Sequence, residues 1–104
     1  MQQRADRLSS SIHKIAAEVL RGVTSDAYIT VTRVDVSPDL HQALVWVSVY
    51  HPDQQESDIF SSVLEYRSSV RGAVAKQLHL RKVPYIEFKH DTSAAVADEI
   101  NKHM

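Results

Sequence analysis

The most regular pattern in the sequence is an alternation of side chains along residues 43–50, which read ALVWVSVY. A period of two is that of a β-strand, whose successive side chains point to opposite faces of a sheet. One face carries Ala43, Val45, Val47 and Val49, and the other carries Leu44, Trp46, Ser48 and Tyr50. The chain must therefore build a sheet that has a valine-rich face to cover.

A second strand is predicted just before this one, at residues 29–36, because ITVTRVDV is rich in β-branched side chains. The short link SPDLHQ contains a proline and an aspartate, which favour turns, so the two strands form a hairpin. Val31 and Val34 lie an odd number of positions apart. A bulge near Thr32 and Arg33 is needed if both valines are to face inward.

Two segments have the apolar spacing of amphipathic helices. Residues 7–23 place apolar side chains mostly three or four positions apart, with Asp6 as a candidate N-cap and Gly22 as an end signal. Residues 58–79 continue the same spacing, and Ser57 is a candidate N-cap for them.

The second helical segment is expected to be kinked and then to give way to a third strand. Ser68–Ser69 and Gly72 weaken a helix interior, so a kink is predicted there. Val83–Pro84 prevents the helix from continuing, and alternation along residues 85–89 predicts the strand.

The predicted order is thus α-β-β-α-α-β, an α+β single domain within 104 residues. Its helices pack on one face of a three-stranded mixed sheet, and the helical crossover makes the third strand parallel to at least one neighbour. Residues 1–91 are assigned to this domain and residues 92–104 to a short C-terminal helical extension. No run approaches the roughly 18 apolar residues of a membrane span, and the absence of cysteine fits a reducing cytoplasm.

Charge is distributed unevenly along a chain whose formal net charge is only −1. Residues 51–65 contain four acidic side chains and no Lys or Arg, whereas residues 66–86 contain five basic side chains and no Asp or Glu. The basic block can be a solvated surface of no particular function, or it can meet a polyanion.

The sequence offers little for catalysis or metal binding. The histidines are scattered, without an i,i+4 pair on a helix: His13, His41, His51, His79, His90 and His103. No nucleophile elbow and no glycine-rich phosphate loop occur. Neither an enzyme nor a bound metal or cofactor is therefore expected, although His79 and His90 could add positive charge at mildly acid pH.

Two motifs resemble those of the ribosome-binding factor A family. The hairpin V-S-P-D-L-H-Q-A-L-V-W-V is similar to the family pattern V-x-S-x-D-L-x-x-A-x-V-x-V at Ser37, Asp39, Leu40, Ala43, Val45 and Val47. The later stretch L-R-K-V-P-Y-I-E-F-K-H-D-T-S is similar to R-x-V-P-x-L-x-F-x-x-D-x-S at Arg81, Val83, Pro84, Ile86, Phe88, Asp91 and Ser93. The resemblance extends over nearly the whole chain.

This resemblance implies a type II KH-like fold and a bacterial or organellar assembly factor without enzymatic activity. Such a factor binds the maturing small ribosomal subunit and its RNA, helps the RNA ends mature, supports growth in the cold, and leaves before translation. The family lacks the GxxG loop with which true KH domains clamp RNA. It carries an Ala-x-Gly kink between its two later helices, where this chain has Tyr66, Arg67 and Ser68.

The RNA-facing candidates are basic residues. The principal ones are Arg67, Arg71, Lys76, Arg81 and Lys82, and the secondary ones are Arg4, Arg7, Arg33 and Lys89. Arg67 and Arg71 lie four apart, on one side of a helix, and each guanidinium can pair with a phosphate. Trp46, Tyr50 and Tyr85 are expected to fill the outer side of the sheet rather than to stack on bases.

The expected partners are small-subunit ribosomal RNA and the free, non-translating small subunit, bound by a cytoplasmic monomer that contacts no membrane. An assembly GTPase is left open as a further partner. The alternative function is a protein-interaction module that uses the acidic block and the open sheet face, with RNA contact incidental. A small enzyme remains a third possibility, which would require a polar pocket with two ionisable groups.

Overall fold

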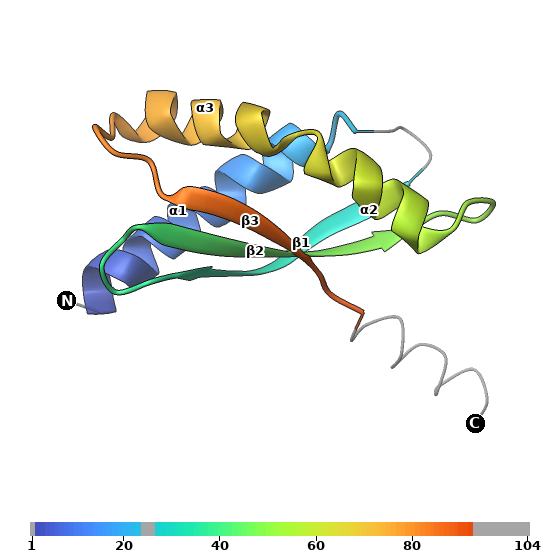
Figure 1. Cartoon of the computed structure of the whole chain (residues 1–104), viewed down its shortest axis with the longest axis horizontal. Coiled ribbons are helices and arrows are strands. Elements are labelled where there is room, and N and C mark those ends of the chain that lie inside the picture. Colours follow the sequence, from blue (N-terminus) through green and yellow to red (C-terminus); the bar gives the residue numbers. More distant parts are fainter. Residues whose placement is uncertain (1, 24–26, 93–104) are drawn as a thin grey trace.

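The computed structural model describes residues 2–23 and 27–92, which form the predicted order of elements (Figure 1). The elements are α1 (Gln2–Leu20), β1 (Tyr28–Val36), β2 (Gln42–Tyr50), α2 (Glu56–Leu64), α3 (Arg67–Leu78) and β3 (Tyr85–His90). The α+β prediction is confirmed. The expected C-terminal helix falls on residues 93–104, outside the described residues, and none of the described helices is long and apolar enough to cross a membrane.

Within the described part of the chain the sheet has three strands in the order β1-β2-β3. β1 and β2 pair antiparallel as a hairpin, and β3 runs parallel to β2, as the helical crossover requires. The register shifts between Val31 and Arg33, so Thr32 is the extra residue of a β-bulge. The bulge lets both Val31 and Val34 be buried, which confirms the predicted irregularity.

The core lies between one face of this sheet and the layer of helices. Figure 1 shows α1, α2 and α3 on the same side of the sheet. The inward valines of β2 are almost completely buried, and Ile86 and Phe88 of β3 are buried beside them. The helices contribute Ile12, Ile15, Ala16, Leu20, Ile59, Val63, Val70 and Val74. The other face of the sheet carries no described helix, so its side chains are only partly covered.

Two predicted helix starts are wrong. Asp6 is not an N-cap, because α1 already begins at Gln2. Ser57 lies inside α2, whose N-cap is Gln55 and has no side-chain capping hydrogen bond. In both cases the helix extends a few residues further toward the N-terminus than the capping side chains indicate.

The kink between the later helices exists, but it lies earlier than predicted. α2 and α3 are separated by Glu65 and Tyr66, whose φ angles are −68° and −92°. The Glu65 amide donates to the Ser62 carbonyl at 3.2 Å, and the Tyr66 amide donates to the Val63 carbonyl at 2.9 Å. Both bonds reach three residues back, so the end of α2 tightens. Because neither residue has a positive φ, the break needs no glycine. Ser68 and Gly72 both lie within α3.

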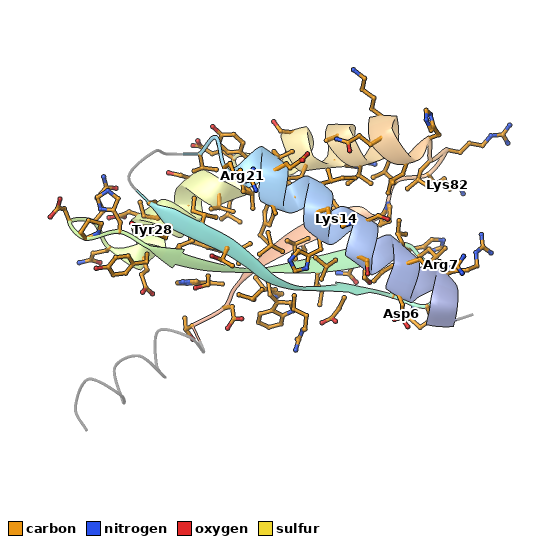
Figure 2. The ribbon with its side chains drawn as sticks, turned by 180° about the vertical axis from the view of Figure 1, so that it is seen from behind. Asp6, Arg7, Lys14, Arg21, Tyr28 and Lys82 are labelled. Carbon is orange, nitrogen blue, oxygen red and sulfur yellow. The ribbon has the colours of Figure 1, made fainter. Side chains whose placement is uncertain are left out.

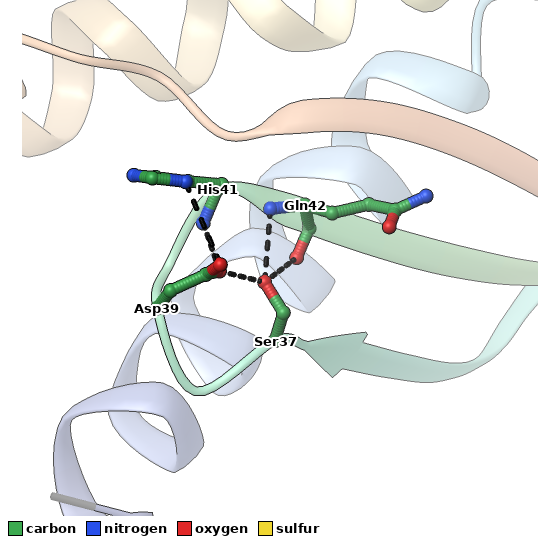
Figure 3. Close-up of polar contacts among 4 residues, drawn as sticks. All are labelled: Ser37, Asp39, His41 and Gln42. Atoms are coloured by element: carbon green, nitrogen blue, oxygen red, sulfur yellow. Dashed lines mark hydrogen bonds and ion pairs between the residues drawn. The ribbon is translucent and has the colours of Figure 1, made fainter.

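The link between β1 and β2 is held by a small polar network (Figure 3). The Ser37 hydroxyl donates to the Asp39 carboxylate at 2.7 Å, and the His41 amide donates to the same carboxylate at 3.0 Å. The Gln42 amide donates to the Ser37 hydroxyl at 3.0 Å. Leu40, in the left-handed region at a φ of 63°, completes the turn. Ser37 and Asp39 therefore define the hairpin turn.

The Asp39 carboxylate gives this turn a predictable dependence on pH. The Ser37 hydroxyl, and next the His41 amide, hold the pKa of Asp39 below its ordinary value. The ionised carboxylate thus stabilises the fold above the unfolded-state pKa of about 3.9, and this contribution is lost as pH falls through the folded-state pKa.

We expect Asp39→Asn to be less stable than wild type at pH 7. The difference should shrink below about pH 4, as measured by urea unfolding between pH 3 and 7. A difference that stays constant over that range would contradict the role of the carboxylate charge.

Candidate nucleic-acid interface

Two of the predicted cations lie together on the flank of α3 that faces β3. Arg67 is the first residue of α3, and Arg71 follows one turn later. Both are exposed, while Val70 and Val74 on the adjoining side of the helix are buried in the core. The buried valines fix the rotation of α3, and this rotation directs both arginines toward the seam between α3 and β3.

A groove runs along this seam. One part, of about 300 Å³, is lined by Ser68, Arg71, Gly72, Ala75 and Val83. The next part, of about 400 Å³, is lined by Leu64, Glu65, Arg67, Ser68, Tyr85, Glu87 and Phe88. Ser68 lines both parts, so the two depressions are neighbours, and together we call them the α3–β3 groove.

Arg67 is held in the groove by Tyr85, the first residue of β3. Its Nη1 donates a hydrogen bond to the Tyr85 hydroxyl at 2.5 Å. The guanidinium carbon also lies 4.9 Å from the centroid of the tyrosine ring, within the range of a cation–π contact. Tyr85 remains 51% exposed, so it does not fill the outer side of the sheet as expected.

The groove is not uniformly basic. Glu65 and Glu87 line the part that contains Arg67, whereas Arg71 is the only ionisable residue lining the other part within the described structure. Glu65, the last residue of the acidic block, thus lines the same depression as Arg67. One end of the groove therefore suits an anion, and the other end mixes both signs.

The other principal candidates lie around the C-terminal end of α3. Lys76 is exposed but lies about 140° around the helix from Arg71, and so on the opposite flank. Arg81 and Lys82 are exposed in the segment that joins α3 to β3. That segment begins with His79 in the left-handed conformation, at a φ of 53°, which ends the helix. The structure thus brings Arg67 and Arg71 together and separates Lys76 from them.

Two secondary candidates lie on the sheet face opposite the helices. Trp46 of β2 has Arg33 as its register partner in β1 and Lys89 as its partner in β3. The Arg33 guanidinium lies 4.9 Å from the Trp46 ring centroid and pairs with Asp35 at 2.9 Å. Lys89 pairs with Glu87 at 3.3 Å. Acidic neighbours compensate both charges, which makes this face a weaker attractor of phosphate.

The last two candidates, Arg4 and Arg7, are exposed near the start of α1. In Figure 2 Arg7 lies toward the same end of the molecule as Lys82, whereas Lys14 lies further along α1 and Arg21 just beyond its end. Neither Arg4 nor Arg7 lines the α3–β3 groove.

Sequence reasoning missed three contributors to the groove. Tyr85 was assigned to the outer side of the sheet, and Ser68 and Gly72 were treated only as helix-weakening residues. Ser68 and Gly72 directly follow Arg67 and Arg71 in the sequence, which could have indicated a common surface. Within residues 2–23 and 27–92, no group of three or more acidic or histidine side chains is placed to hold a metal ion.

Comparisons with known proteins agree with this architecture. The family model of ribosome-binding factor A matches residues 4–104. Ribosome-binding factor A from Natranaerobius thermophilus is 33% identical over 102 residues, which cover 95% of this chain and 78% of that protein. The crystal structure of ribosome-binding factor A from Thermus thermophilus superposes with a TM-score of 0.69 at 19% identity, over 83% of this chain and 94% of that one.

A second structural neighbour is a homology model of the Thermus thermophilus factor, fitted into a cryo-EM map of a complex between the 30S subunit and ribosome-binding factor A. Its TM-score is 0.67 at 18% identity, over 82% of this chain and 92% of that one. At these identities the two structures support the fold alone, and the family model and the sequence relative carry the assignment. The chain is a member of the ribosome-binding factor A family.

Proposed function

We propose that this chain is a non-enzymatic assembly factor that binds the small ribosomal subunit and assists late maturation of its RNA, including in the cold. Family membership over residues 4–104 is the observation that carries this proposal. The complex of the 30S subunit with a related factor supports the choice of partner. Binding without catalysis is also consistent with a chain whose distinguishing features are a groove and a set of exposed cations.

The α3–β3 groove is the proposed contact with ribosomal RNA. Arg67 and Arg71 approach phosphates there, and Arg81 and Lys82 extend the contact beyond the end of α3. Guanidinium groups suit this role because they can hold a phosphate through two parallel hydrogen bonds. Lys76, Arg4, Arg7, Arg33 and Lys89 contribute secondary contacts from other surfaces.

The mechanism we propose is differential binding. The factor binds an immature arrangement of the RNA more tightly than the mature one, so it stabilises the former and leaves when the latter forms. It acts in the cytoplasm as a monomer on free subunits, and an assembly GTPase is a candidate agent of release. Residues 1–91 form the binding domain in this proposal, and residues 92–104 form its extension.

Sedimentation of a lysate through a sucrose gradient tests the proposal. We expect the protein to migrate with free small subunits and to be absent from translating ribosomes. RNA contact predicts that log affinity falls with log salt by about 0.7–0.9 for each phosphate neutralised. An affinity that barely changes between 50 and 200 mM salt would instead favour the protein-interaction module. Absence from the small-subunit fractions would contradict the proposed function.

A further inference from the structure

Two exposed tyrosines face each other at one end of the β1–β2 hairpin. Tyr28 is the first residue of β1 and Tyr50 is the last residue of β2, and the two are register partners. Their ring centroids lie 6.1 Å apart at an interplanar angle of 37°, a distance typical of an aromatic pair. Val49, the neighbour of Tyr50, is buried toward the helices, so both rings lie on the opposite, open face of the sheet.

This aromatic pair contributes little to the core. Tyr28 is 72% exposed and Tyr50 is 52% exposed, and neither packs against the buried cluster. Tyr50 does lie on the outer side of the sheet, as expected, but about half of it remains in solvent. Tyrosine is enriched among the residues that dominate protein–protein interfaces. Because the two rings are contiguous, they form a candidate contact surface.

The segment that follows Tyr50 is acidic. No Lys or Arg occurs in residues 34–66, and the first turns after the hairpin carry the carboxylates of Asp53, Glu56 and Asp58. Of these three, within the residues that the structure describes, Glu56 alone has an ion-pair partner, which is His90 at 3.7 Å. The carboxylates of Asp53 and Asp58 are thus available to a cation from another molecule.

The two ends of the molecule differ in charge. Figure 2 shows Tyr28 at the end opposite to Arg7 and Lys82. Arg33, on the same sheet face as the tyrosines, is compensated by Asp35 at 2.9 Å. A phosphate is therefore repelled at the tyrosine end, whereas a cation is attracted there.

The acidic loop beside the tyrosines is held in place by a histidine. His51 Nδ1 accepts hydrogen bonds from the amides of Asp53 and Gln54, both at 3.0 Å. Asp53 follows Tyr50 by three residues, so their Cα atoms lie at most about 11 Å apart. A loop that is already ordered loses less conformational freedom when it binds a partner.

We propose that the Tyr28–Tyr50 pair and the adjoining acidic segment bind an arginine-rich segment of another protein. A guanidinium suits this surface better than an ammonium group, because it is planar, stacks on aromatic rings and is more weakly hydrated. One arginine of the partner lies over a tyrosine ring, and its neighbours pair with carboxylates such as that of Asp53. The inference goes beyond the proposed function, since it adds a protein partner. RNA-binding proteins are commonly basic, so the particle that the factor is proposed to bind can supply such a segment.

Fluorescence anisotropy with a labelled peptide of Gly-Ser-Arg repeats, and with the same peptide carrying Glu in place of Arg, tests the proposal on the full chain. We expect wild type to bind the arginine peptide at least about 10-fold more tightly than the glutamate peptide. Tyr28→Ala with Tyr50→Ala should weaken arginine-peptide binding about 10-fold, because two ring contacts are lost. Tyr28→Phe with Tyr50→Phe should retain most of the affinity, because both rings remain.

A second double variant tests the carboxylates without changing the sheet. Asp53→Asn with Asp58→Asn should weaken arginine-peptide binding about 3- to 5-fold. Asp6→Asn with Glu18→Gln is the matched control, since both residues are exposed on α1 and the change in net charge is the same. We expect this control to bind like wild type. Equal weakening by the two double variants would assign the attraction to net charge and overturn the role of the acidic segment.

Tyr85→Ala is the matched control for the rings. Its side chain is 51% exposed, almost the same as that of Tyr50, but it lies in the α3–β3 groove. Tyr50→Ala alone should weaken arginine-peptide binding about 3-fold, whereas Tyr85→Ala should not weaken it. Equal behaviour of these two single variants would overturn the assignment of the contact to the hairpin end.

Two further results would overturn the proposal. One is equal affinity of wild type for the arginine and glutamate peptides. The other is that the double alanine variant at Tyr28 and Tyr50 loses affinity for a labelled single-stranded RNA but not for the arginine peptide, which would make the pair an RNA surface. Peptide binding also weakens with salt, so the variants and not the salt dependence distinguish this contact from the RNA contact. Wild type that migrates with free small subunits but does not prefer the arginine peptide refutes only this inference.

Discussion

Replacing Arg67 and Arg71 together by glutamate should lower the affinity for small subunits by roughly 100-fold at low salt while leaving the fold intact. Loss of each charge-assisted contact with a phosphate at an exposed site costs about 1.4 kcal/mol, or tenfold, and the introduced carboxylates add repulsion. The slope of log affinity against log salt should also fall by about 1.4–1.8, because two phosphates are no longer neutralised. Co-sedimentation across a salt series measures both quantities.

The same double variant should not lose stability, which makes the binding result interpretable. Glutamate at position 67 stands next to the positive end of the α3 dipole and should stabilise the helix by about 0.3–1 kcal/mol. This gain offsets the lost contact between Arg67 and Tyr85 at the surface. We expect the free energy of unfolding to stay within about 0.5 kcal/mol of wild type in urea.

Lys14→Glu with Arg21→Glu is the matched control, because it makes the same change in net charge on α1 and just beyond its end (Figure 2). Neither residue lines the α3–β3 groove. If both double variants weaken binding equally, the effect belongs to the net charge of the molecule and not to the groove. If the groove variant binds like wild type, the proposed RNA contact is wrong.

The fold could be predicted from the sequence because the strongest patterns, the regular spacings of apolar side chains, mark the residues that are buried in the core. The alternation along β2 appears as a row of buried valines, and the odd spacing of Val31 and Val34 appears as the bulge at Thr32. The family motifs are likewise mostly structural. Ser37 and Asp39 form the hairpin turn, while Ile86 and Phe88 belong to the core.

The candidate site was only partly predictable, because an exposed side chain leaves no periodic signal. The charge block indicated Arg67 and Arg71, but it grouped them with Lys76, which the rotation of α3 places on another flank. Tyr85 follows a buried proline at the start of an edge strand. Whether the Tyr85 side chain lies flat on the sheet or turns toward α3 depends on its contact with Arg67. Arg67 is 18 positions away in the sequence, so no local sequence pattern predicts that contact.

The break between α2 and α3 shows how a tertiary contact can replace a local sequence preference. Where the family pattern has a small residue, this chain has Tyr66, whose side chain packs against the core. Its hydroxyl donates to the carbonyl of Gly22, beyond the end of α1, at 3.2 Å. We infer that Tyr66 fixes the position of the break by joining it to α1, so that no glycine is needed.

Tyr66→Ala should therefore destabilise the protein by about 2–3 kcal/mol, somewhat less than the 3–5 kcal/mol typical of a fully buried aromatic side chain, because Tyr66 is only partly buried. Tyr66→Phe should cost only about 0.5–1 kcal/mol, since it removes the hydrogen bond and keeps the ring. Urea unfolding gives both values. Leu64→Ala, at an exposed position two residues away, is the control and should change stability by no more than about 0.5 kcal/mol. If Tyr66→Ala costs no more than Leu64→Ala, the tyrosine does not anchor the break, and the backbone of Glu65 and Tyr66 must adopt it without that contact.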